Sequence, residues 1–125
     1  MPGAPGIEGY TLDEVGAEKL RCIAERLQCR DLFDLHELLD AQQIDPVEAW
    51  HLYLRKAAND MARRRQRTPP REWADAFDRR LGGYRGRWEQ ELGDYLPSVP
   101  GFSDVERRCR RHLGPVIAAA RALPQ

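Results

Sequence analysis

The sequence predicts an all-α fold, a bundle of about five to six helices joined by short loops. Apolar residues recur at helical spacing between capping residues and prolines, whereas no segment alternates polar and apolar residues with a period of two. β-Branched residues are sparse, which disfavours a sheet. With 125 residues, 42% of them hydrophobic and 32% charged, the chain is long enough to form one domain with its own core.

Two helices are expected near the start of the chain. Thr11 and Glu14 have the spacing of a capping box, which opens a helix that should run to about Gln28. A second helix should follow over about residues 31–42. Because the loop between them is so short, the two helices are expected to pack against each other as a hairpin.

Four further helices are expected in the rest of the chain. Asp45 is a good N-cap and is followed by proline at the first helical position, which opens a helix that should run to about Arg64. The next helix should cover residues 70–81 and be stopped by Gly82-Gly83, and another should cover residues 85–96. A last helix should start at a capping box of Ser103 and Glu106 and be kinked or broken at Gly114-Pro115.

Composition excludes several classes of protein. The 20 basic and 20 acidic side chains cancel, so no overall field attracts nucleic acid. No apolar run approaches the roughly 18 residues that span a bilayer, and the start of the chain does not resemble a secretory signal. Three cysteines without a CxxC pair argue against a disulfide framework; Cys22 and Cys29, taken to lie on one helix, should be small buried hydrophobes. We therefore expect a cytoplasmic protein that does not enter a membrane.

Charged residues at the margin of the first two helices are the main candidates for a functional site. Lys19 and Arg26 lie seven residues apart along the edge of the apolar stripe of the first helix, while Glu25 should be solvated on its far side. On the second helix, Asp31 falls inside the arc of leucines and Asp34 at its margin. Burying an unpaired carboxylate costs several kcal/mol. Asp31 should therefore be mostly buried and within salt-bridge reach of Lys19, Arg26 or Arg30.

Two interpretations of this cluster remain open from the residues alone. In one, it is a structural set of ion pairs, and the Lys19 ammonium is fully paired with Asp31 or Asp34. In the other, Lys19 binds a phosphate while an aspartate orients a metal or accepts a proton. Lys19 would then point into an open groove, with carboxylates nearby but no close pairing. We expect the second arrangement, because Lys19 lies at the margin of its stripe and lysine is a flexible point charge suited to phosphate.

A resemblance to a known family supports the second interpretation. The residues that carry it are Glu18-Lys19-Leu20, then Arg26, then the run from Arg30-Asp31 to Asp34-Leu35, with Tyr10 to Glu14 as a lead-in. These residues resemble the third and fourth motifs of the AbiEii/AbiGii nucleotidyltransferase toxins. The match is dense over about residues 10–40 and weak afterwards.

The resemblance implies a polymerase-β-like nucleotidyltransferase, the toxin of an abortive-infection or toxin–antitoxin pair. Such an enzyme transfers a nucleotide from an NTP, with Mg²⁺, to an acceptor such as tRNA, and is partnered by a cognate antitoxin. By residue, Lys19 would match the lysine that binds the nucleotide phosphates. Asp31 and Asp34 would match the acidic pair, one of them acting near the acceptor hydroxyl, and Arg26 and Arg30 would support them.

The resemblance also implies a division of the chain. Residues 1–9 should be a loop or a cut edge, and residues 10–125 a single helical domain like the C-terminal subdomain of such an enzyme. Within it, residues 10–42 form the helix pair that bears the motifs, and residues 45–125 form a variable helical tail.

The first two family motifs, a Gly-Ser turn and an Asp-x-Asp strand, are missing from this sequence. The chain is therefore expected to be the C-terminal helical part of such a toxin, by truncation, gene decay or a split gene. As an isolated chain it should be inactive and bind neither Mg²⁺ nor NTP tightly, because its N-terminal catalytic half is missing. The alternative is a non-enzymatic helical interaction module, such as a decayed toxin that still binds an antitoxin. Whether this chain acts as an enzyme is left open by its residues.

Three other groups of residues have simpler interpretations. The run of Arg63, Arg64, Arg65 and Arg67 is either a contact with an RNA backbone or a solvated helix end. No metal site is expected, because His36, His51 and His112 have no metal-ligand spacing. Core positions are expected for the three tryptophans, which are Trp50, Trp73 and Trp88.

Overall fold

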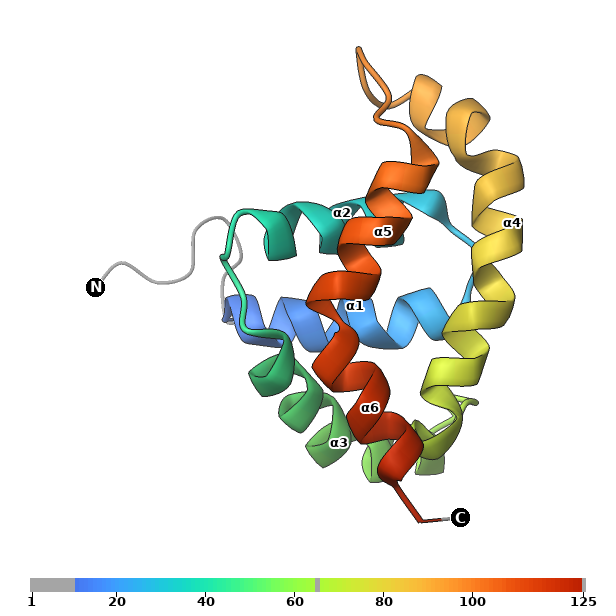
Figure 1. The fold of residues 1–125 in the computed structure, drawn as a ribbon. Coiled ribbons are helices and arrows are strands. Elements are labelled where there is room, and N and C mark those ends of the chain that lie inside the picture. Colours follow the sequence, from blue (N-terminus) through green and yellow to red (C-terminus); the bar gives the residue numbers. More distant parts are fainter. Residues whose placement is uncertain (1–10, 65, 125) are drawn as a thin grey trace.

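The computed structural model describes residues 11–64 and 66–124, and within these residues it contains helices and no strand. The all-α prediction is confirmed. The elements shown in Figure 1 are α1 (Leu12–Glu25), α2 (Cys29–Asp40), α3 (Pro46–Ala62), a short 3₁₀ helix η1 (Pro70–Glu72), α4 (Trp73–Gly93), α5 (Phe102–His112) and α6 (Gly114–Ala122). The expected loop over residues 1–9, Tyr10 of the lead-in and Arg65 lie outside the described residues.

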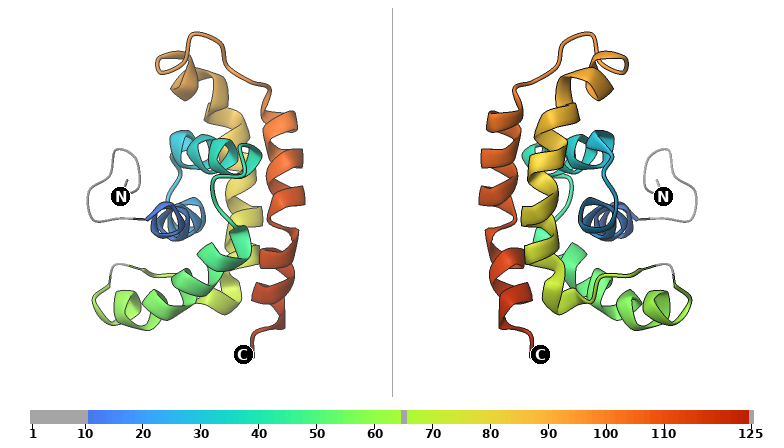
Figure 2. Two further views of the ribbon diagram at one scale, coloured as in Figure 1. Left: turned by 90° about the vertical axis from the view of Figure 1, so that its left-hand side faces the viewer. Right: turned by 90° about the vertical axis from the view of Figure 1, so that its right-hand side faces the viewer.

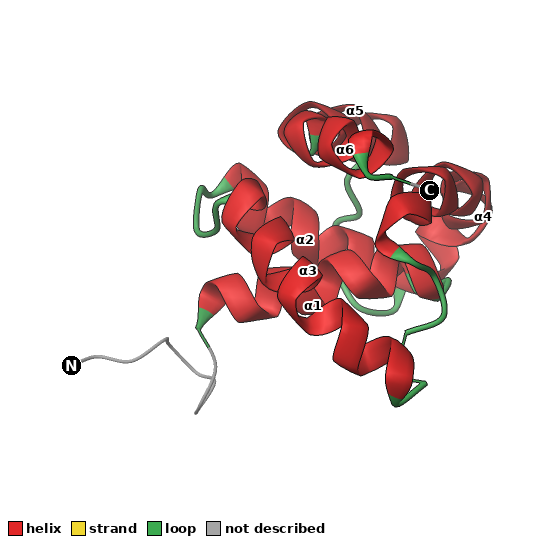
Figure 3. Cartoon of the chain, turned by 90° about the horizontal axis from the view of Figure 1, so that it is seen from below, coloured by secondary structure: helices red, strands yellow, loops and turns green. Residues whose placement is uncertain are grey.

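The α1–α2 hairpin lies at the centre of the fold. Its two helices run antiparallel, and α1 also contacts α3 and α4, while α2 contacts α4 and α5. Helices α5 and α6 follow each other in nearly one line along one side of the molecule (Figure 2). Seen from below, α4 and the α5–α6 pair lie together on one side of the group formed by α1, α2 and α3 (Figure 3). The hairpin is therefore positioned by α3, α4 and α5.

Aromatic rings form the part of the core that joins α3 to α4. Trp50 stacks on Tyr53 at a centroid distance of 5.0 Å and meets the edge of Trp73 at 5.8 Å. Trp73 stacks in turn on Phe77 at 5.4 Å. All three tryptophans are buried, as predicted, with Trp88 packed against the N-terminal end of α5. Such ring pairs contribute about 0.5–1.5 kcal/mol each beyond the area that they bury.

Two cysteines confirm their predicted burial but not their predicted placement. Cys22 and Cys29 are both buried and both free thiols. They lie on different helices, because α1 ends at Glu25 and α2 begins at Cys29. The prediction of a single helix carrying both cysteines, and of a first helix reaching Gln28, was wrong.

Side chains of α4 explain why α1 ends early. The last carbonyl groups of any helix lack partners within the helix and need donors from elsewhere. Here the donors come from more than 50 residues later in the chain. Trp73 donates to the carbonyl of Leu20, Arg80 to that of Ala24, and the Tyr84 hydroxyl lies within hydrogen-bond distance of the carbonyls of Ile23 and Arg26, at 2.8 to 3.3 Å.

One long helix replaces two that were expected. The prediction that Gly82-Gly83 stops a helix was wrong, because α4 runs through both glycines from Trp73 to Gly93. A glycine inside a helix costs only about 1 kcal/mol, which is less than the burial of Leu81, Tyr84 and Trp88 on the same helix contributes. A Cβ at residue 83 would lie 2.8 Å from a methyl carbon of Leu27, so glycine here allows the α1–α2 loop to pack closely.

Helix starts were predicted with mixed success. The capping box of Thr11 and Glu14 is present, and the Asp45 carboxylate accepts a hydrogen bond from the backbone N–H of Val47 at 2.9 Å. The capping box at Ser103 is absent, because α5 already begins at Phe102. The N-cap is Gly101, two residues before the predicted one, and next to it the Trp88 indole N–H donates to the carbonyl of Pro100 at 2.7 Å.

The ends of the middle helices follow the backbone conformation. Helices α2 and α3 each end about two residues before the predicted position, at Asp40 and Ala62. Gln42 and Arg64, with φ of 55° and 60°, then adopt the left-handed conformation that commonly follows a helix end. The predicted break at Gly114-Pro115 is confirmed, since α5 ends at His112 and α6 begins at Gly114. No helix in the described part of the chain is long and apolar enough to cross a bilayer.

Candidate functional site

The charged residues singled out in the sequence meet between the first two helices. Lys19 comes from α1, Arg26 follows its last residue, and Asp31 and Asp34 come from the first two turns of α2. The leucines of α2 fill the core and thereby fix the rotation of the helix, which turns Asp31 toward α1. We refer to Lys19, Arg26, Asp31 and Asp34 as the hairpin cluster.

One ammonium group joins the two carboxylates of the hairpin cluster. The Lys19 Nζ lies 3.1 Å from Asp31 Oδ1 and 3.1 Å from Asp34 Oδ2. On the other side of Asp31, Arg26 donates through Nε to Oδ2 at 2.8 Å and through Nη2 to Oδ1 at 3.3 Å. This is the bidentate geometry in which a guanidinium holds a carboxylate most firmly. Both oxygens of Asp31 are therefore bound by cations.

The hairpin cluster has a buried centre and an open rim. The Asp31 side chain is 3% exposed, whereas the side chains of Lys19, Asp34 and Arg26 are 21%, 32% and 49% exposed. The prediction that Asp31 is mostly buried and within salt-bridge reach of Lys19, Arg26 or Arg30 is confirmed by the contacts with Lys19 and Arg26.

The prediction for the environment of Lys19 was wrong. We expected an ammonium in an open groove without close pairing, and it is bound to both aspartates. The reason is the three-residue spacing of Asp31 and Asp34, which places both on one face of α2. Arg26 pairs only with Asp31, so Lys19 pairs with Asp34 as well as with Asp31.

Arg30 does not belong to the hairpin cluster. Its guanidinium lies over the ring of Tyr95 at 4.1 Å from the centroid, just beyond the C-terminal end of α4. The start of α2 is held by a residue of α4, because the Glu91 carboxylate accepts a hydrogen bond from the backbone N–H of Cys29 at 3.0 Å. Any support from Arg30 is therefore given to the placement of α2 and not directly to the aspartates.

Contacts within the hairpin cluster favour its ionised form. Burial alone would raise the pKa of Asp31, but the hydrogen bonds from Arg26 and Lys19 outweigh it and hold the pKa below its ordinary value of 3.8. Burial alone would lower the pKa of Lys19, but its hydrogen bonds to Asp34 and Asp31 raise it above 10.5. Each group is thus stabilised in its charged state by its partners.

The lowered pKa of Asp31 predicts an acid-dependent contribution to stability. A carboxyl whose pKa is lower in the folded state contributes stability above its unfolded pKa, and this is lost as the pH falls through the folded pKa. The difference in unfolding free energy between wild type and Asp31→Asn should be constant near pH 6 and shrink below about pH 4. Urea unfolding across this range measures it, with the exposed Asp104→Asn as the control. A difference that does not change with pH would contradict the prediction.

Glu25 has a role that the sequence did not indicate. It was expected to be solvated, yet its side chain is only 10% exposed. Its Oε2 accepts hydrogen bonds from the backbone N–H groups of Arg67 and Thr68, at 2.7 and 2.5 Å. The only local signal for this contact is the acidic side chain itself, because its partners lie more than 40 residues away.

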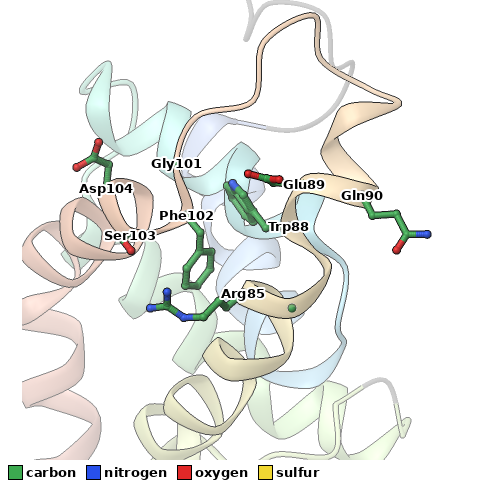
Figure 4. A pocket seen from close by; sticks show the side chains of 9 residues that line it. Arg85, Trp88, Glu89, Gln90, Gly101, Phe102, Ser103 and Asp104 are labelled. Atoms are coloured by element: carbon green, nitrogen blue, oxygen red, sulfur yellow. The ribbon is translucent and has the colours of Figure 1, made fainter.

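One hollow in the described surface lies elsewhere. It has a volume of about 720 Å³ and is bounded by α4 and the start of α5, with Arg85, Trp88, Phe102 and Asp104 among its lining residues (Figure 4). No member of the hairpin cluster lines it. Among the described residues, no group of three or more His, Cys, Asp or Glu is arranged to hold a metal ion.

Comparison with known proteins gives one match. The family model described as "Nucleotidyl transferase AbiEii toxin, Type IV TA system" matches residues 1–108, which include every member of the hairpin cluster. The match extends well beyond residues 10–40, through α4 and into α5. No curated protein and no solved structure matches the chain.

Proposed function

The chain belongs to the AbiEii family of nucleotidyl transferase toxins, and we propose that it forms the helical part of such an enzyme, with the hairpin cluster at the nucleotide. In this proposal the reaction moves a nucleotide from an NTP to an acceptor such as the end of a tRNA. The toxin acts in the cytoplasm, in abortive infection, and is held in check by a cognate antitoxin. Three buried free thiols are compatible with a reducing compartment.

The observation that carries the proposal is the state of the Lys19 ammonium. An ammonium has three N–H donors, and the two aspartates take two of them. The third has no partner among the described residues, and the side chain is partly exposed. A phosphate oxygen is the acceptor that this donor suits, since lysine binds phosphate as a compact point charge. Only two of the 20 basic residues are lysines, Lys19 and Lys56. A lysine in the hairpin cluster is therefore not explained by a lysine-rich sequence.

The two aspartates differ in what they offer to a reaction. Asp31 is buried and bound by both Arg26 and Lys19, so in this proposal it positions the two cations. Asp34 is about one-third exposed and binds only the Lys19 ammonium, through Oδ2. Its other oxygen could therefore contact the hydroxyl group that receives the nucleotide. We assign Asp34 as the carboxylate near the acceptor hydroxyl, where a base must come within hydrogen-bond reach of the proton it takes.

Mg²⁺ is typical of the family's reaction, and the described residues fit it poorly. The ion prefers several oxygen ligands in octahedral geometry. Asp31 has both oxygens bound to cations, and no suitable group of ligands exists among the described residues. In this proposal the metal is therefore not held by this chain. The Gly-Ser and Asp-x-Asp motifs, absent from the sequence, are assigned to the missing N-terminal catalytic half.

The proposal is tested by adding the missing half. Purified chain incubated with labelled NTPs, Mg²⁺ and total tRNA should incorporate no label above background, because positioning and metal-borne charge stabilisation supply most of the rate of phosphoryl transfer. Fusing the N-terminal half of another AbiEii-family protein to the chain, or adding it in trans, should produce labelling. Labelling by the isolated chain would overturn the proposed division of labour.

The alternative is that the chain is a non-enzymatic module or decayed toxin that binds an antitoxin. The close pairing of Lys19 favours it, because a neutral, internally paired cluster needs no ligand. In that case a fusion that folds and binds the antitoxin would remain silent with every NTP. Binding of the antitoxin, measured by titration calorimetry, is expected of either form, so the silence of a folded fusion is the result that distinguishes the module from the enzyme.

A further inference from the structure

Arginines gather in the turn between α3 and α4. Residues 63–71 contain Arg63, Arg64, Arg67 and Arg71, all exposed, and Arg65, which lies outside the described residues. No acidic residue interrupts them before Glu72. In a chain whose charges cancel overall, these nine residues carry five arginines and no acidic residue. We refer to residues 63–71 as the arginine turn.

The arginines of this turn are not used to pair with the protein itself. Within the described residues, Arg63, Arg64 and Arg67 form no ion pair, and Arg71 reaches only its neighbour Glu72 at 3.9 Å. Elsewhere in the described residues most exposed arginines form an ion pair, for example Arg85 with Glu106 and Arg121 with Asp78. Like charges placed together without partners repel one another, so their clustering calls for an anionic ligand.

The backbone of the arginine turn is held in place by the side chains of Gln66 and Glu25. Gln66 is 2% exposed, and its amide donates to the Tyr53 hydroxyl at 2.7 Å and to the carbonyl of Thr68 at 2.9 Å. The Glu25 carboxylate binds the next two backbone N–H groups, as described above. One buried side chain and one carboxylate therefore fix the backbone near Gln66, while Arg64 and Arg67 are exposed. A fixed backbone lowers the entropy cost of binding a partner.

The residue types indicate which anion is bound. Guanidinium groups match phosphate oxygens in a bidentate geometry, and a row of them suits the evenly spaced phosphates of a nucleic acid. Apart from Pro69 and Pro70, residues 63–71 contain no apolar side chain, and none of the large apolar side chains that an anchor in a lipid surface would need. We propose that the arginine turn binds the phosphate backbone of an RNA; the choice of RNA rests on the proposed function, whereas the anionic surface does not.

The position of the turn relates it to the hairpin cluster. Glu25, which fastens the turn, is followed in the chain by Arg26, which holds Asp31. The turn and the cluster thus share the C-terminal end of α1. In Figure 2 the C-terminal end of α3, where the turn begins, lies on the side of the molecule opposite α5 and α6, whereas η1 at the end of the turn contacts α6. An RNA backbone on the arginine turn therefore lies next to the end of α1 that is followed by Arg26.

The test measures RNA binding by the full chain without NTP. Fluorescence anisotropy of labelled total tRNA should show binding that weakens steeply between about 50 and 200 mM salt. R63Q/R67Q should weaken binding about tenfold near 100 mM salt and reduce the slope of log K against log salt by about two. The matched control is R79Q/R111Q, which removes the same charge from exposed, unpaired arginines of α4 and α5 and should change affinity less than twofold.

Three results would overturn the inference: no binding by wild type at the lowest salt, equal weakening by the two double variants, or tighter binding to phosphatidylserine vesicles than to RNA. Thermal melts of both variants should match wild type, because none of the four arginines is buried or paired. Since the assay contains no NTP and requires no transfer, a silent nucleotidyltransferase assay leaves this result unaffected. Conversely, loss of RNA binding would not affect the proposed role of Lys19, which nucleotide transfer by the fusion tests.

Discussion

Replacing Lys19 by methionine and Arg26 by alanine together should destabilise the fold by about 3–5 kcal/mol, more than the sum of the single changes. After either single change Asp31 keeps one cation, so each should cost only about 1–1.5 kcal/mol. After both, a carboxylate that is 3% exposed has no counter-charge. Urea unfolding of wild type, the two single variants and the double variant measures the coupling between Lys19 and Arg26.

The control for this cycle is Arg79→Ala, an exposed arginine on α4 without an ion pair, which should change the unfolding free energy by less than about 0.5 kcal/mol. Adding Asp31→Asn to the double variant should recover part of the loss, because the uncompensated charge is then removed. Strict additivity of the two single changes would show that water reaches Asp31 and that the hairpin cluster is not closed at its centre.

The sequence predicted those parts of the fold that local signals determine. Thr11 with Glu14, and Asp45 before Pro46, are complete start signals within four residues, and both are present in the structure. The burial of Asp31 could be predicted as well, since its place among the leucines of α2 made an unpaired carboxylate too costly. For the same reason a cation from Lys19, Arg26 or Arg30 was expected within salt-bridge reach of Asp31, although the close pairing of Lys19 was not.

Contacts between distant parts of the chain could not be predicted in this way. The end of α1 depends on donors from α4, and the continuity of α4 through Gly82-Gly83 depends on the surface that it buries. Glu25 looked like a solvated residue because the arginine turn that it binds lies more than 40 residues away. The pairing of Lys19 with Asp34 depends on the register of two helices, which spacing within each helix does not fix.

In the fusion with an AbiEii-family N-terminal half, Lys19→Ala should lower the rate of nucleotide transfer about a hundredfold or more. Removing one well-placed donor from a group that gains charge in the transition state costs about 10²–10³ in rate. Loss of the donor to the phosphate should also weaken NTP binding, so labelling and NTP affinity should both fall. Single-turnover labelling of tRNA and equilibrium NTP binding separate the two effects.

Two control variants decide whether Lys19 acts on the nucleotide or only on the fold. Lys56→Ala removes the other lysine, a surface residue 3.6 Å from Glu14, and should leave transfer unchanged. Arg26→Ala loosens the same hairpin cluster while keeping the ammonium, so it should lower stability as much as Lys19→Ala but NTP affinity far less. If Arg26→Ala and Lys19→Ala reduce NTP affinity equally, Lys19 is a structural residue. If only Lys19→Ala does so, the third N–H of its ammonium is the phosphate donor, and its pairing with two aspartates serves to aim it.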